Sequence, residues 1–167
     1  MSMTKIEYLP EAPAHDAEIE AINEEAFGPG RFARAAYKIR EQGGHDPLLS
    51  FVAMQAGVVI GSVRMTPVKA GEGRALLLGP LAVRPDHKSQ GIGRQLVGLA
   101  LEKARAKGFG AVILVGDAPY YGPFGFVRLP YGQISLPRPA DPNRLLAAEL
   151  SEGAVAKLQG ELMHAGR

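Results

Sequence analysis

The most informative stretch of this 167-residue chain is residues 75–94, which read ALLLGPLAVRPDHKSQGIGR. Its first part, Ala75–Val83, is a long aliphatic run typical of a buried strand, interrupted only by Gly79-Pro80. Two glycines follow in Lys88–Arg94, before Gly93–Lys107, where apolar residues recur at helical spacing. The stretch therefore predicts a strand, a glycine loop and a helix in succession.

The glycine loop predicts an anion site at the start of the helix. The first helical N–H groups have no acceptor within the helix, and the helix dipole favours negative charge there. Lys88 and Arg94 add positive charge, so a pyrophosphate is the natural ligand. The third glycine of a dinucleotide fingerprint is replaced by Leu96, and Arg94-Gln95 replaces the Lys-Ser or Lys-Thr of a P-loop.

The Gly79-Pro80 pair predicts a bulge that separates this strand from one neighbour, because proline cannot donate to a strand ladder. Free N–H and C=O groups would then remain between Leu81 and Val83. A linear ligand that carries amides, such as pantetheine, would pair with them as a surrogate strand. The alternative is a bulge that only shapes the sheet.

Two motifs carry a resemblance to a known family. Leu81–Arg94 resembles motif A of the GNAT superfamily of N-acetyltransferases, in which Arg or Gln, two residues, Gly, one residue and then Gly or Ala hold the pyrophosphate of CoA. Lys88 takes the first place and keeps the charge without the forked guanidinium. Tyr121–Phe126, YGPFGF, is similar to the second signature, a tyrosine four residues before Gly-Phe. Residues 115–126, VGDAPYYGPFGF, look like the YhbS-like group of predicted acetyltransferases.

The resemblance implies acetyl-CoA as cosubstrate and direct attack of a neutral amine on the thioester in a ternary complex. Main-chain groups of Leu81, Ala82 and Val83 would hold pantetheine. Tyr121 would be the general acid that protonates the departing thiolate, and the adjacent Tyr120 is the alternative. The pyrophosphate would be held by a run of loop residues: Lys88, Ser89, Gln90, Gly91, Ile92, Gly93 and Arg94.

Two helices are predicted on the acceptor side. A helix is predicted over Asp16–Phe27, with Asp16 as its cap, and a second over Arg31–Gln42. The first is rich in glutamate and the second in arginine and lysine, so the two are either solvated faces that attract each other or the rim of a substrate site. Glu24 and Glu25 are expected to be exposed, and His87 is expected at the surface. No general base is assigned.

The predicted fold is a single α/β (α+β) domain over residues 1–167, with a GNAT-like mixed, mostly antiparallel sheet flanked by helices. The expected element order is β-α-α-β-β-β-α-β-(short helix or turn)-β-β. Residues 75–126 would form the cofactor half, and residues 16–42 and 127–167 the acceptor side. Periodicity leaves Arg144–Leu150 open between helix and strand.

Composition narrows the function classes. The net charge of +2 does not require nucleic acid, and the absence of cysteine excludes disulfides, thiolate metal sites and a cysteine nucleophile. No signal peptide, membrane span or metal-ligand spacing is expected, so the protein is expected to be cytoplasmic. The expected activity is acetyl transfer to a small-molecule or peptide amine. The alternatives are a non-catalytic acyl-CoA-binding regulatory module and an enzyme that uses the loop for NAD or ATP. A homodimer is also possible on the sequence alone.

Overall fold

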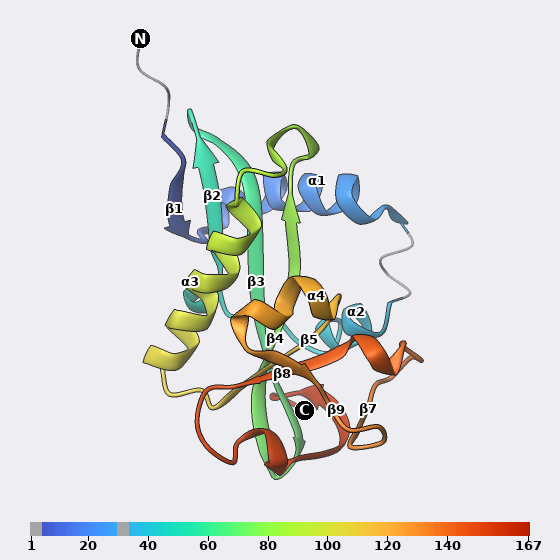
Figure 1. Cartoon of the computed structure of the whole chain (residues 1–167). Helices are drawn as coiled ribbons and strands as arrows, with labels where there is room; N and C mark the ends of the chain where they lie inside the picture. The colour runs from blue at the N-terminus through green and yellow to red at the C-terminus, as the bar shows by residue number, and fades with distance from the viewer. Residues whose placement is uncertain (1–4, 30–33) are drawn as a thin grey trace.

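The computed structural model describes residues 5–29 and 34–167 (Figure 1). Four helices are described: α1 (Asp16–Phe27), α2 (Ala35–Arg40), α3 (Ile92–Ala106) and α4 (Ala118–Tyr121). The strands are β1 (Glu7–Pro10), β2 (Phe51–Gln55), β3 (Val58–Gly71), β4 (Gly73–Val83), β5 (Ala111–Val115), β6 (Phe126–Arg128), β7 (Ile134–Ser135), β8 (Leu145–Glu149) and β9 (Leu158–His164). Short 3-10 turns join several of these elements, including one at Pro85–His87.

The strands form one sheet in the order β1-β2-β3-β4-β5-β8-β6, and β9 pairs with both β3 and β7. The pairs β4–β5 and β7–β9 are parallel, and the other pairs are antiparallel. The prediction of a mixed, mostly antiparallel sheet flanked by helices is confirmed.

Helices cover the two faces of the sheet (Figure 1). On one face, α3 packs its apolar stripe, with Leu96 and Val97 fully buried, against the strands. On the other face, α1 buries Ile19 and Ile22, and α2 buries Ile39. Because side chains alternate along a strand, neighbouring aliphatic residues of β4 serve both layers. Leu76 contacts the α3 side and Leu77 the opposite side.

The N-terminal elements differ from the prediction in two respects. The bounds of α1 agree, but Asp16 does not cap the helix. His15 occupies the capping position, and the Asp16 carboxylate instead accepts a hydrogen bond from Arg64 on β3. A charged partner on β3 has taken the place of the local cap. The second helix is shorter than predicted, beginning at Ala35; the predicted start at Arg31 lies outside the described residues.

The C-terminal part contains more strands than the sequence indicated. Residues Leu145–Glu149, left open between helix and strand, form β8, which pairs with β5 on one side and β6 on the other. Pairing on both edges decides the conformation, and local periodicity does not carry that information. Within residues 5–29 and 34–167, no helix is both long and apolar enough to cross a membrane.

Candidate active site

The middle of β4 contains the predicted bulge. On the β3 side, the register passes from Val63↔Leu81 to Met65↔Leu78, which leaves Gly79 and Pro80 out of the ladder. On the other side, β5 pairs with β4 only at Leu76 and Leu77. Beyond Leu77, the β5-facing edge of β4 has no strand partner in the described part of the chain.

The pairing with β3 shows which main-chain groups face this open edge. Arg84 N–H donates to the Ile60 carbonyl at 2.8 Å, and the same register places Ala82 opposite Ser62. Antiparallel pairs alternate between bonded and non-bonded, so Ala82 directs its main chain toward β3. The main-chain N–H and C=O groups of Leu81 and Val83 therefore face the open edge. Of the three residues predicted to bind pantetheine, these two therefore present main-chain groups, while the Ala82 side chain is buried beneath α1.

The loop between β4 and α3 presents a second group of unused N–H donors. The first backbone bond of α3 runs from Gln95 N–H to the Gly91 carbonyl, at 3.0 Å. In the described structure, no backbone bond originates from the N–H groups of Ser89–Arg94. Ser89 and Gly91 have positive φ angles of 68° and 78°, which turn the chain into the helix. Lys88, Gln90 and Arg94 are exposed, whereas the Ile92 side chain is buried and leaves only its main chain for a ligand.

The two adjacent tyrosines of α4 occupy different environments. The Tyr121 ring packs against Phe126, with centroids 5.8 Å apart, and lies close to Gly116 after β5. Burial raises the pKa of Tyr121 to about 12, and negative charge at Tyr120 and Asp117 adds to this effect. Tyr120 instead directs its hydroxyl to the first turn of α3, where a Cβ atom on Gly93 would lie 2.6 Å from it.

A cavity of about 180 Å³ opens at the bulge on the α1 and α2 face of the sheet. Asn23 of α1, Arg40 of α2, Thr66 of β3 and Gly79 of β4 contribute to its walls. The acidic and basic helices noted in the sequence thus meet around one pocket. Glu24 and Glu25 are exposed, as expected. His87 is partly buried and hydrogen-bonded to Gln55 and Asp86.

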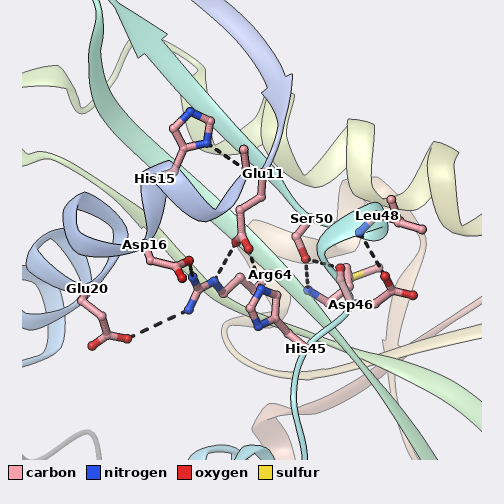
Figure 2. A network of polar contacts seen from close by, with 11 residues as sticks. Glu11, His15, Asp16, Glu20, His45, Asp46, Leu48, Ser50 and Arg64 are labelled. Carbon is pink, nitrogen blue, oxygen red and sulfur yellow. Dashed lines mark hydrogen bonds and ion pairs between the residues drawn. The ribbon is translucent and has the colours of Figure 1, made fainter.

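Figure 2 shows a polar network, of which Glu20, His45 and Arg64 line this cavity. The Arg64 guanidinium contacts three carboxylates: Glu11 at 2.7 Å, Asp16 at 3.1 Å and Glu20 at 4.0 Å. His45 Nε2 lies 2.6 Å from the second oxygen of Glu11. Burial raises the pKa of Glu11, but hydrogen bonds from His45 and Arg64 and their charges outweigh burial and hold the pKa below its usual value.

Sequence reasoning missed this network because its members come from separate segments. One signal was available in the aliphatic strand sequence VVIGSVRM, residues 58–65, where Arg64 is the only charged residue. Such a residue in a buried strand needs a partner.

Comparison with known proteins places the chain in a family. Residues 16–126 match the Acetyltransferase (GNAT) family. The chain belongs to the GNAT acetyltransferase family. Over 153 residues, 90% of each chain, it is 29% identical to the uncharacterised N-acetyltransferase YhbS of Escherichia coli K12. Over 114 residues it is 31% identical to YjhQ of the same organism, covering 66% of this chain and 63% of that protein.

Solved structures agree with the family assignment. The crystal structure of E. coli YhbS in complex with CoA superposes with a TM-score of 0.78 at 26% identity, covering 98% of this chain and 91% of that one. A GNAT acetyltransferase from Brucella melitensis in complex with acetyl-CoA gives 0.62 at 27% identity, covering 90% and 98%. Among the described residues of this GNAT chain, no cluster of three or more histidine or carboxylate side chains is arranged to hold a metal ion.

Proposed function

We propose that this single-domain chain is an acetyl-CoA-dependent N-acetyltransferase that moves the acetyl group to an amine by direct attack in a ternary complex. The observation that carries the proposal is the open edge of β4. Main-chain groups of Leu81 and Val83 face this edge, and the unused N–H groups of Ser89–Arg94 follow directly along the chain. A long ligand with amides at one end and a pyrophosphate at the other matches this sequence of donors and acceptors.

The cofactor residues have separate roles in this proposal. Leu81 and Val83 pair with the pantetheine amides, and Ala82 holds that segment against β3 and α1. The loop N–H groups bind the pyrophosphate, with positive charge from Lys88 and Arg94. The complete set is Leu81, Ala82, Val83, Lys88, Ser89, Gln90, Gly91, Ile92, Gly93 and Arg94.

The reaction itself needs one proton donor and one proton acceptor. The neutral amine nitrogen bonds to the thioester carbonyl carbon, the carbon–sulfur bond breaks, and the sulfur leaves as a thiolate. Tyr121 donates its proton to that sulfur; a pKa of about 12 keeps its phenol protonated at neutral pH. His45, held at Nε2 by Glu11 on the wall of the pocket, is the proposed base that takes the proton released by nitrogen.

The test combines turnover with binding. The protein is incubated with acetyl-CoA and a panel of small amines and short peptides while thiol release is followed. We expect Tyr121→Phe to lower kcat by about 10²- to 10⁴-fold, which is the usual contribution of a general acid. We also expect CoA, but not NAD or ATP, to raise the melting temperature.

Two results would contradict the proposal. CoA protection without turnover on any acceptor, and without an effect of Tyr121→Phe, would identify a non-catalytic acyl-CoA-binding regulatory module. Protection by NAD or ATP in place of CoA would assign the loop to a different nucleotide.

A further inference from the structure

Arg40 is a buried cation that has no counter-charge among the residues that the structure describes. Its Nε atom is buried and has no hydrogen-bond partner, although the residue as a whole is partly exposed. None of the ion pairs within residues 5–29 and 34–167 involves it. Burial lowers its pKa to about 10, with Tyr37 opposing, so the guanidinium remains charged at neutral pH. Its Nη2 atom lies where it would come within 2.5 Å of a Cβ atom on Gly79.

The carboxylates around the cavity already have partners. Glu11, Asp16 and Glu20 surround Arg64, and Glu41 pairs with Lys38 at 3.5 Å. Among the described residues, two arginines thus line one pocket: Arg64 has three carboxylates around it, and Arg40 has no ion-pair partner. An uncompensated buried charge is unfavourable, and a ligand that supplies the missing anion removes that penalty.

Two further polar atoms of the same pocket lack partners. Asn23 Oδ1 and Thr66 Oγ1 are buried and make no hydrogen bond in the described structure. Both residues line the cavity with Arg40. Buried polar atoms are nearly always satisfied, so unpaired ones on residues that line one cavity indicate where a ligand binds. Oxygen atoms accept the N–H groups of an amine, and the guanidinium donates to an anion.

We propose that the acetyl acceptor is a small amine that also carries a carboxylate, such as an amino acid, and that Arg40 binds this carboxylate. Asn23 Oδ1 and Thr66 Oγ1 accept hydrogen bonds from the amine. The volume of about 180 Å³ is small for a ligand site and suits a molecule of this size. This inference rests on the proposed function and deepens it by naming the acceptor class.

The experiment compares acceptors in matched pairs: glycine with glycinamide and β-alanine with β-alaninamide, at equal concentrations of neutral amine. Initial rates give kcat/KM for the wild type, Arg40→Met and Arg40→Lys. We expect the wild type to prefer the carboxylate of each pair by about 10- to 100-fold, as a charge-assisted hydrogen bond allows. Arg40→Met should abolish this preference and leave the amides within about 3-fold, and Arg40→Lys should keep part of it. Arg105→Met, at an exposed position of α3 outside the pocket, is the control for loss of a positive charge and should keep the preference.

Aminomethylphosphonate is a third acceptor that distinguishes a carboxylate site from a general anion site. Transfer to it at the rate of glycine would overturn the carboxylate assignment. Equal rates for both members of each pair would overturn the inference while leaving the acetyltransferase intact. A uniform loss in Arg40→Met with every acceptor, together with slower hydrolysis of acetyl-CoA alone, would also overturn it, because Arg40 would then act on the thioester.

A binding measurement keeps the inference testable if no acetyl transfer is seen, a result that would contradict the proposed function by itself. The melting temperature of the CoA-saturated protein is measured with each acceptor. Protection by glycine and β-alanine but not by their amides, lost in Arg40→Met, supports the carboxylate site. Equal protection, or none, rules it out.

Discussion

At the scale of single residues, the two arginines of the pocket predict opposite effects on stability. Arg40→Met removes a buried charge that has no partner, so we expect the free energy of unfolding to rise by about 1–3 kcal/mol. Arg64→Met removes one of the two partners of Glu11, a side chain only 3% exposed, and should lower the free energy of unfolding by about 3–5 kcal/mol. Urea unfolding at neutral pH measures both. A loss of stability in Arg40→Met would contradict the account of an uncompensated cation.

The raised pKa of Tyr121 leads us to expect a loss of folding stability at alkaline pH. Its pKa is about 12 in the folded protein and near 10 in the unfolded chain, so the unfolded state loses its proton first as pH rises. The contribution is fully present below pH 10 and is lost progressively between about pH 10 and 12. We therefore expect the stability of the wild type to decline more steeply over this range than that of Tyr121→Phe, measured by urea unfolding at several pH values. Tyr131→Phe, which alters a residue that is 90% exposed, is the control and should follow the wild type.

Some of the proposed site residues could be predicted from the sequence, and others could not. Gly91, Gly93 and Tyr121 stand in short local patterns, and the resemblance of those patterns to the GNAT motifs is what predicted them as site residues. Arg40 and Thr66 carry no such pattern. Their importance comes from being buried without a partner, which depends on which segments pack around them.

At the scale of elements, α3 contains two glycines, Gly93 in its first turn and Gly98 near its middle. We expect replacement by alanine to have different effects at these two positions. At Gly98, an added Cβ atom meets nothing within 4 Å, so Gly98→Ala should stabilise the fold by about 0.5–1 kcal/mol and leave CoA affinity unchanged. At Gly93, the added atom meets the Tyr120 hydroxyl at 2.6 Å. Gly93→Ala should therefore gain less stability and bind CoA about 10-fold more weakly, because Tyr120 must move beside the pyrophosphate loop.

A double variant tests the stated cause. Removing the hydroxyl in Gly93→Ala/Tyr120→Phe should recover most of the lost affinity in isothermal titration with CoA. Purely additive effects of the two substitutions would show that the hydroxyl is not responsible.

The bounds of helices and strands could be predicted where a local sequence pattern sets them. They could not be predicted where strands distant in the sequence pair with each other. The last residues of β3, up to Gly71, pair with β4 across a hairpin and also with β9 from the far end of the chain. Ala165 N–H even donates to the Pro67 carbonyl at 3.0 Å, a contact across nearly 100 residues that no window of sequence reveals.

At the scale of the whole molecule, Glu11 connects the segment after β1 with β3 and with the residues before β2. Its pKa is held below the usual value, so its contribution to stability is present above about pH 4.5 and is lost as pH falls through the folded-state pKa. We expect Glu11→Gln to be less stable than the wild type at pH 7, and the difference to shrink as the pH is lowered toward 3. Thermal unfolding across this range measures it. Glu72→Gln, at an exposed turn, is the control and should show no such trend.

The bulge at Gly79-Pro80 lines the pocket and belongs to the same strand as the open edge, and this has a consequence for inhibitor design. In the proposed arrangement, the thiol arm of CoA lies along β4 and the amine approaches from the pocket beneath α1 and α2. A compound that joins both halves must cross the gap through a single short tether. Lengthening the tether by several methylenes should weaken inhibition, and a carboxylate on the amine half should strengthen it.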